Sequence, residues 1–166
     1  EERGKGHDEL LEAWPAVASF AYDDEFLYFA ASCRKHAGLA YEPADEPRES
    51  DSADPRRDRV EFFLDVDRDG VTAYRFTIDD RGCPGDACWH SEAWNPTWFV
   101  ARDDDEEHWR VEAAIPLSEL TGEPPQTGNA WAVTIQRVLP GEGLQSFSQP
   151  ASVDGRIEGS GFLRFE

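Results

Sequence analysis

Three tryptophans, Trp89, Trp94 and Trp98, lie close together in a segment rich in turn-forming residues. The flat face of an indole ring can pack against the apolar face of a sugar ring, so tryptophans in a loop can form a platform for a carbohydrate. The run Trp94-Asn95-Pro96-Thr97-Trp98 should expose at least one of these rings. The same side chains could instead cap a hydrophobic core where strands end, and the pattern leaves both interpretations open.

A second group of residues has the spacing of a calcium-binding loop. Asp65, Asp67 and Asp69 precede Gly70 in the order D-x-D-x-D-G. An EF-hand is excluded, because the twelfth loop position is Phe76 and the flanking segments are predicted strands rather than helices. Since Asp and Gly also favour hairpin turns without metal, the three aspartates are a candidate structural calcium site and no more.

The chain has three cysteines, two of which are five positions apart. Cys83 and Cys88 flank a Pro-Gly pair that would permit a tight turn, which predicts a small disulfide loop if the protein is exported. Free thiols are the alternative, followed by a zinc site that would need His90 as a further ligand. Cys33 lies in an apolar stretch and is predicted to be a buried thiol.

No pattern in the sequence is typical of an enzyme. The four histidines lack metal-ligand spacing, and the sequence contains neither a glycine-rich phosphate loop nor a Gly-x-Ser-x-Gly motif. Two carboxylates at the separation used by glycosidases could still occur by chance among so many acidic residues. We therefore predict a non-catalytic protein.

Composition narrows the class of partner. The chain has 166 residues, 39% of them hydrophobic, which suits one domain with a single core. A formal net charge of −19 opposes binding to nucleic acid and to anionic membranes. No apolar run reaches the roughly 20 residues that a membrane span requires. A strongly acidic, lysine-poor surface fits a saline habitat or calcium capture, and equally a merely soluble protein.

Alternating hydrophobic residues predict strands, and turn-forming residues separate them. We expect one antiparallel β-sandwich domain, jelly-roll or immunoglobulin-like with little helix, over residues 15–166, after a tail or short helix at 1–14. Irregular segments are expected at 37–57 and 80–96, and a helical turn at 116–120. The predicted strands span residues 16–22, 25–32, 59–66, 72–79, 97–102, 108–114, 129–138 and 161–165.

Two features concern the inside of this sandwich. Trp109 and Trp131 lie on the apolar faces of their predicted strands and are expected to be core residues. Arg137 continues the core face of the strand at 129–138, so it needs a carboxylate partner, which Glu61 or Glu112 could supply. The pair would be either a buried structural ion pair or a site that holds hydroxyl groups.

Five segments together resemble family 9 carbohydrate-binding modules, in the order that the family has them. The first segment, Tyr22-Asp23-Asp24-Glu25-Phe26-Leu27-Tyr28, matches the family's hairpin Y/W-D-x-x-x-L-Y, and the second, Asp58-Arg59-Val60-Glu61-Phe62-Phe63-Leu64-Asp65, matches its strand D-x-V-E-x-F-x-D. The third, Phe76-Thr77-Ile78-Asp79, matches F-x-V-N. The last two, Trp109-Arg110-Val111-Glu112-Ala113-Ala114-Ile115-Pro116 and Gly161-Phe162-Leu163-Arg164-Phe165, match W-x-V-E-A-A-I-P and F-G-x-L-x-F.

The resemblance implies a sugar-binding β-sandwich of modular secreted proteins, in which two tryptophans clamp a terminal sugar and polar residues bind its hydroxyls. By position, the family's glutamate falls on Glu61 and its asparagine on Asp79. Its arginine falls on Thr77, with Arg75 close by. The first clamp tryptophan falls near Pro55, and the second falls in the segment 152–159, which has no aromatic residue. The resemblance also implies structural calcium.

The sequence thus predicts a non-catalytic carbohydrate-binding module of a larger secreted protein, extracellular or in the cell envelope. Its partners would be a polysaccharide or free sugar ends and other domains of the same polypeptide; calcium is the expected cofactor, with no organic one. One alternative is a structural or interaction domain of a surface protein. Another is a haem-binding relative of the DOMON group, which would need an axial Met or a His pair, and the chain has no Met. The candidate ligand-binding residues are Glu61, Arg75, Asp79, Trp89, Trp94, Trp98 and Arg137.

Overall fold

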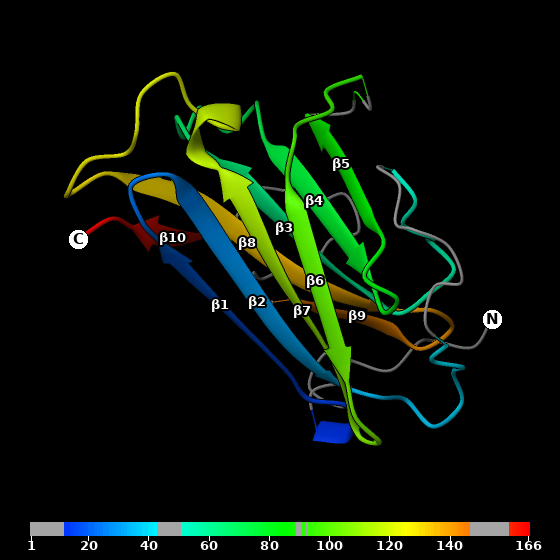
Figure 1. Ribbon diagram of the computed structural model, residues 1–166. Coiled ribbons are helices and arrows are strands. Elements are labelled where there is room, and N and C mark those ends of the chain that lie inside the picture. Colours follow the sequence, from blue (N-terminus) through cyan, green and yellow to red (C-terminus); the bar gives the residue numbers. More distant parts are fainter. Residues whose placement is uncertain (1–11, 43–50, 89–90, 92, 147–159) are drawn as a thin grey trace.

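Two antiparallel sheets face each other in the computed structural model, which describes residues 12–42, 51–88, 91, 93–146 and 160–166 (Figure 1). The first sheet has the order β1-β2-β7-β6, with β1 (Ala16–Tyr22), β2 (Phe26–Arg34), β7 (His108–Pro116) and β6 (Phe99–Asp104). The second has the order β10-β8-β3-β4-β5, with β10 (Gly161–Arg164), β8 (Ala130–Leu139), β3 (Arg59–Asp65), β4 (Tyr74–Asp79) and β5 (Pro84–Cys88). The predicted antiparallel sandwich is confirmed.

Two strands of the second sheet were not predicted from the sequence. β5 lies within the segment 80–96, where Pro84 and Gly85 obscure the strand pattern. A proline is tolerated at the first position of a strand that pairs on one side, and β5 pairs with β4 alone among the described residues. β9 (Gly143–Ser146) pairs with the last residues of β8 after a tight turn. The only described 3₁₀ helix, η1 (Leu117–Glu119), takes the place of the predicted helical turn.

Aromatic rings from both sheets form the centre of the core. Phe62 of β3 stacks on Phe29 of the opposite sheet with ring centroids 4.3 Å apart, and on Phe76 of β4 at 5.0 Å. Trp109 and Trp131 are both buried, as predicted. Because Val60, Phe62 and Leu64 point into this core, the residues between them in β3 point to the outer face of the second sheet.

Arg137 is a core residue, as its place in β8 predicted, but its partner is neither Glu61 nor Glu112. Its guanidinium donates to both carboxylate oxygens of Asp58, from Nε at 2.9 Å and from Nη2 at 2.6 Å. Its remaining donors reach the backbone carbonyls of Trp14 and Arg34. The structural interpretation of Arg137 therefore holds, because every bond it makes is internal to the sandwich.

Most of the predicted N-terminal tail, residues 1–11, lies outside the described residues. The division into a tail and a sandwich domain stays a prediction. Trp14 is held against the sandwich, because its carbonyl accepts hydrogen bonds from Arg137 and from the side chain of Gln145. Within the part of the chain that the structure describes, no helix has the length and apolar character needed to cross a membrane.

Candidate functional site

A pocket of about 420 Å³ opens on the outer face of the second sheet. We call it the outer-sheet pocket. Its floor comes from three neighbouring strands, in which Glu61 lies opposite Thr77, and Thr77 lies opposite Gly85. The loop before β3 supplies its other side. The residues that line it are Asp51, Ala53, Pro55, Arg59, Glu61, Arg75, Thr77, Gly85 and Asp86.

Glu61 is the acidic group at the floor of this pocket, and it is 7% exposed. One carboxylate oxygen accepts a hydrogen bond from Nε of Arg59 at 2.6 Å, and the other accepts one from Nε2 of Gln136 at 2.7 Å. Arg59 in turn donates to the carbonyl of Pro55, which ties the loop to the strand. A carboxylate offers about four lone-pair positions, so Glu61 is held in place and can still accept further bonds.

Two buried polar atoms beside Glu61 lack a partner among the described residues. They are Nε of Arg75 and Oε1 of Gln136. Leaving such an atom unsatisfied costs about 1–3 kcal/mol, and Arg75, unlike Gln136, lines the pocket, so an acceptor from a ligand would be favoured there. Hydroxyl groups both donate and accept, and they match the guanidinium of Arg75 and the carboxylate of Glu61, which both line the pocket.

The space in the pocket depends on a glycine. A Cβ atom added to Gly85 would lie 3.3 Å from Cβ of Ala53 and 3.8 Å from Cβ of Thr77. Any larger side chain at this position would stand in the pocket, against the loop that covers it. Gly85 therefore leaves the volume that a ligand would fill.

Asp79, a predicted ligand-binding residue, is fully buried and holds the turn between β4 and β5. Its carboxylate accepts hydrogen bonds from the backbone N–H groups of Asp54, Arg81 and Cys83, and from the side chain of Arg81 at 2.6 Å. These bonds occupy the carboxylate and fix the loop that forms one side of the outer-sheet pocket. Asp79 thus positions the pocket and does not open into it.

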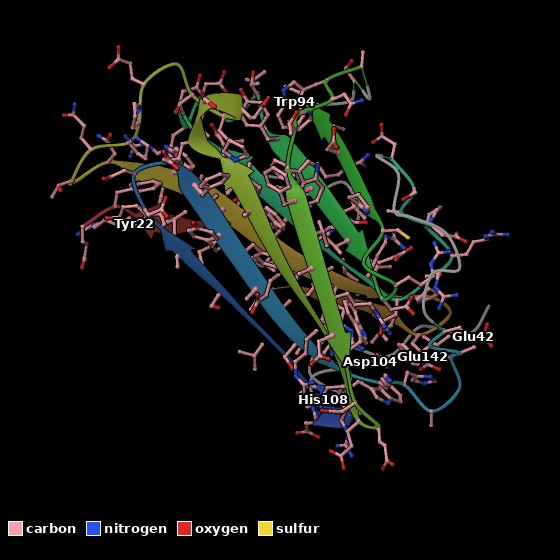
Figure 2. The ribbon with its side chains drawn as sticks, viewed as in Figure 1. Tyr22, Glu42, Trp94, Asp104, His108 and Glu142 are labelled. Atoms are coloured by element: carbon pink, nitrogen blue, oxygen red, sulfur yellow. The ribbon has the colours of Figure 1, made fainter. Side chains whose placement is uncertain are left out.

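Trp94 and Trp98 pack on the core side of the second sheet, opposite to Glu61. The ring of Trp94 lies 4.6 Å from Tyr74 and 5.6 Å from Phe76, at the end of the sandwich where β5 ends (Figure 2). Trp98 meets the same Phe76 edge-on at 5.0 Å. The structure therefore does not bring these tryptophans together with Glu61 and Arg75. Trp89 lies outside the described residues.

The indole of Trp98 also bonds one oxygen of the buried Asp86 carboxylate, whose other oxygen, Oδ1, has no partner among the described residues. Its Nε1–H donates to Oδ2 of Asp86 at 3.0 Å. Burial raises the pKa of Asp86 above its ordinary value of 3.8, the hydrogen bond from Trp98 opposes that rise, and the charge of Asp51 adds to it. Asp86 also lines the outer-sheet pocket, so Trp98 supports the pocket from behind.

The three aspartates of the candidate calcium loop do come together. One carboxylate oxygen from each of Asp65, Asp67 and Asp69 lies within 4.8 Å of the others. Asp65 is buried and accepts the backbone N–H groups of Arg68 and Gly70. Burial, together with the hydrogen bond to Asp67, raises the pKa of Asp65. Oxygen donors at this spacing suit calcium, which stays a prediction.

The predicted disulfide between Cys83 and Cys88 is wrong. Cys83 directly precedes β5 and Cys88 ends it, and both are free thiols. An extended strand rises about 3.3 Å per residue, so the two Cα atoms are much further apart than the ~7 Å limit for a disulfide. The expected tight turn is absent because Pro84 and Gly85 are part of the strand. Cys33 is buried, as predicted, and burial raises its pKa to about 12. The alternative zinc ligand His90 lies outside the described residues.

Comparison with known proteins identifies the fold. No protein-family model and no curated protein matches the sequence. A family 9 carbohydrate-binding module from Caldicellulosiruptor kristjanssonii, solved in complex with glucose, superposes with a TM-score of 0.63 at 15% identity, over 92% of this chain and 77% of that one. The module from the same organism in complex with cellotriose gives 0.61 at 18% identity, over 91% and 74%.

A third solved structure, a candidate carbohydrate-binding protein from Bacteroides uniformis, has a TM-score of 0.68 at 14% identity, over 91% of this chain and 78% of that one. The chain therefore has the β-sandwich fold of family 9 carbohydrate-binding modules. The fold that the five sequence segments implied is confirmed.

Proposed function

We propose that this chain is a non-catalytic carbohydrate-binding module that holds a sugar in the outer-sheet pocket. The observation that carries the proposal is the buried Glu61 carboxylate, fixed by Arg59 and Gln136, beside an Arg75 Nε that has no partner among the described residues. The likeness to modules solved with glucose and with cellotriose supports the same class of ligand.

The chemistry of the pocket favours a neutral sugar. Glu61 accepts hydrogen bonds from sugar hydroxyls, and Arg75 donates to a hydroxyl or ring oxygen. None of the described lining residues is aromatic, so hydrogen bonds rather than ring stacking hold the ligand. The formal net charge of −19 disfavours acidic polymers such as pectin and leaves neutral glycans such as glucan and xylan.

The proposal extends to the setting of the module. We place it in a larger secreted protein, where it keeps a neighbouring domain close to a glycan at the cell surface or outside the cell. Its solved structural neighbours include carbohydrate-binding modules, which supports this setting.

Affinity gel electrophoresis against soluble glucan, xylan, mannan and pectin tests the function. Retardation by a neutral polymer is expected, and the Glu61→Gln variant should lose it. Glu112→Gln makes the same change on an exposed position of β7, in the other sheet, and should keep it. If no polymer and no oligosaccharide binds, the chain is the structural or interaction domain that the sequence left as the alternative.

A further inference from the structure

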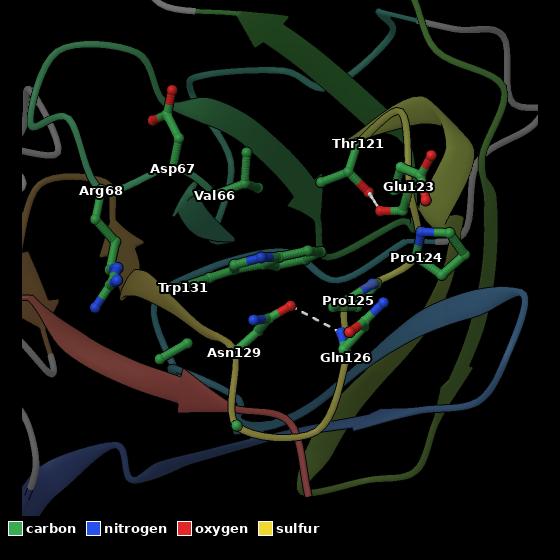
Figure 3. Close-up of a pocket in the computed structure, with 12 residues that line it drawn as sticks. Val66, Asp67, Arg68, Thr121, Glu123, Pro124, Pro125, Gln126, Asn129 and Trp131 are labelled. Atoms are coloured by element: carbon green, nitrogen blue, oxygen red, sulfur yellow. Dashed lines mark hydrogen bonds between the residues drawn. The ribbon is translucent and has the colours of Figure 1, made fainter.

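A second pocket, of about 400 Å³, lies at one end of the sandwich (Figure 3). We call it the end pocket. It opens between the turn that leaves β3 and the loop that leads from η1 into β8. It shares no lining residue with the outer-sheet pocket. Its polar and aromatic lining includes Asp67, Arg68, Glu123, Gln126, Asn129 and Trp131.

Trp131 is the floor of the end pocket. The residue is 3% exposed, and its ring packs edge-on against Phe165 with centroids 4.7 Å apart. Figure 3 shows the indole edge-on in the middle of the pocket, between Thr121 and Val66 on one side and Asn129 and Gln126 on the other. Its N–H makes no hydrogen bond with any described residue, whereas Trp109 and Trp98 each donate to a carboxylate. Nε1 of Trp131 is not among the fully buried polar atoms without a partner, so solvent reaches it and its N–H can donate to a ligand in the pocket.

The rim of the end pocket is fixed by its own hydrogen bonds. Oδ1 of Asn129 accepts from the backbone N–H of Gln126 at 2.8 Å, and the hydroxyl of Thr121 donates to the carbonyl of Glu123 at 2.7 Å. The backbone N–H of Gly128 donates to the carbonyl of Phe165 at 2.7 Å, which ties the loop to the residue that follows β10. The loop is therefore held in shape before any ligand arrives, which reduces the entropy lost on binding.

The rim also presents polar groups that no described residue uses. These are the side-chain amide of Gln126, the N–H₂ group of Asn129 and the carboxylate of Glu123. Arg68 and Asp67 add opposite charges on the other side of the opening. Planar amides and carboxylates around an indole donor suit a ligand with several hydroxyls, and the mixed charge favours a neutral one.

We propose that the end pocket is a second carbohydrate-binding site, in which the N–H of Trp131 donates to a sugar oxygen and Glu123 and Gln126 bind its hydroxyls. The inference rests on the proposed function only for the class of ligand, because the two pockets have different walls. A module with both sites holds two sugar units at once, and linked binding on one glycan chain raises its avidity above the affinity of either site.

The indole N–H signal of Trp131 in the ¹⁵N spectrum of the folded protein reports on this site directly. After assignment among the six tryptophans, the protein is titrated with glucose, cellotriose, xylotriose and mannotriose. At least one sugar should shift the Trp131 signal saturably, in the wild type and equally in Gly85→Val, which blocks the outer-sheet pocket. The double variant Glu123→Ala/Gln126→Ala, whose side chains are exposed, should bind at least about tenfold more weakly at this signal.

Three results would overturn the inference. The Trp131 signal does not move with any of the four sugars, or it moves with the same affinity in the double variant, or its shift disappears in Gly85→Val. The last result would assign the shift to the outer-sheet pocket. A shift of Trp131 without any binding at the outer-sheet pocket would support the end pocket and refute the first site alone.

Discussion

Arg137 and Asp58 form an ion pair inside the sandwich, with two hydrogen bonds of 2.9 and 2.6 Å between the guanidinium and the carboxylate. The same carboxylate accepts the indole N–H of Trp109 at 2.9 Å and the hydroxyl of Tyr41 at 2.8 Å. Trp109 belongs to the first sheet and Arg137 to the second. One buried aspartate thus joins both sheets and the segment after β2, directly before β3 delivers Glu61 to the outer-sheet pocket.

Replacing Arg137 with Met should destabilise the fold without changing the affinity for sugar. The substitution leaves the Asp58 charge buried and unpaired, which costs about 3–5 kcal/mol. Urea unfolding measures the loss. Arg110→Met is the control, since Arg110 pairs with Asp103 and Asp105 at the surface and its loss should change stability little. A folded Arg137→Met protein of wild-type stability that no longer binds sugar would make Arg137 a ligand-binding residue.

Trp94→Ala should lower stability and leave sugar binding intact. The ring packs against Tyr74 and Phe76 at the edge of the core, so its removal should cost up to about 3 kcal/mol. The sequence-based hypothesis of a tryptophan platform predicts the opposite result, with binding abolished and the fold unchanged. Thermal unfolding and calorimetric titration of the same sample distinguish the two interpretations.

Asp86 should make the folded state less stable as the pH rises. Its pKa is raised above 3.8 in the folded protein, mainly by burial, so the folded state holds the proton more tightly than the unfolded chain. The stability that this gives is complete below about pH 4 and is lost as the pH rises through the raised pKa. Asp86→Asn, which still accepts the Trp98 N–H, should therefore flatten the fall in unfolding free energy between about pH 4 and neutrality.

The control for this pH series is Asp24→Asn, which removes the same charge from an exposed position in the turn between β1 and β2. It accounts for the general self-repulsion of a chain with a formal net charge of −19. If both variants have the same pH profile, the dependence belongs to the overall charge and Asp86 has no special share in it.

Calcium should raise the melting temperature through Asp65, Asp67 and Asp69. A cation among the three carboxylates would replace the hydrogen bond between Asp65 and Asp67 with direct ligation, and binding only to the folded state stabilises it. Scanning fluorimetry with millimolar calcium, compared with a chelator, measures the shift. Asp67→Asn should abolish the shift and Asp24→Asn should preserve it. A melting temperature that calcium does not change would show that the three aspartates do not bind calcium.

Strand alternation was enough to predict most of the sandwich, because a residue's side of the sheet follows from its parity along the strand. It placed Trp109 and Trp131 on the core faces of their strands, where the structure has them. It failed for β5, where Pro84 and Gly85 provide no hydrophobic alternation. The same failure produced the wrong disulfide, because a Pro-Gly pair in a strand has the same local sequence as one in a turn.

The rest of the site depends on contacts between distant segments, which local patterns do not encode. The pairing of Arg137 with Asp58 joins residues 79 positions apart, and the contact of Gln136 with Glu61 joins residues 75 apart. The tryptophans were predicted as a platform from their closeness in sequence, but their orientation follows from Phe76, which lies on the core face of another strand. The one residue in the sequence that could have indicated the outer-sheet pocket is Gly85, because the absence of a side chain there leaves room for a ligand between Ala53 and Thr77.

The Gly85→Val variant, titrated calorimetrically with the glycan that retards the wild type, tests the central claim most directly. Because the new side chain fills the outer-sheet pocket against Ala53 and Thr77, we expect the affinity at this pocket to fall at least about tenfold while the fold persists. Ala101→Val enlarges an exposed residue of β6 and should bind like the wild type. Equal affinity of the wild type and Gly85→Val would contradict the claim that this pocket holds the sugar.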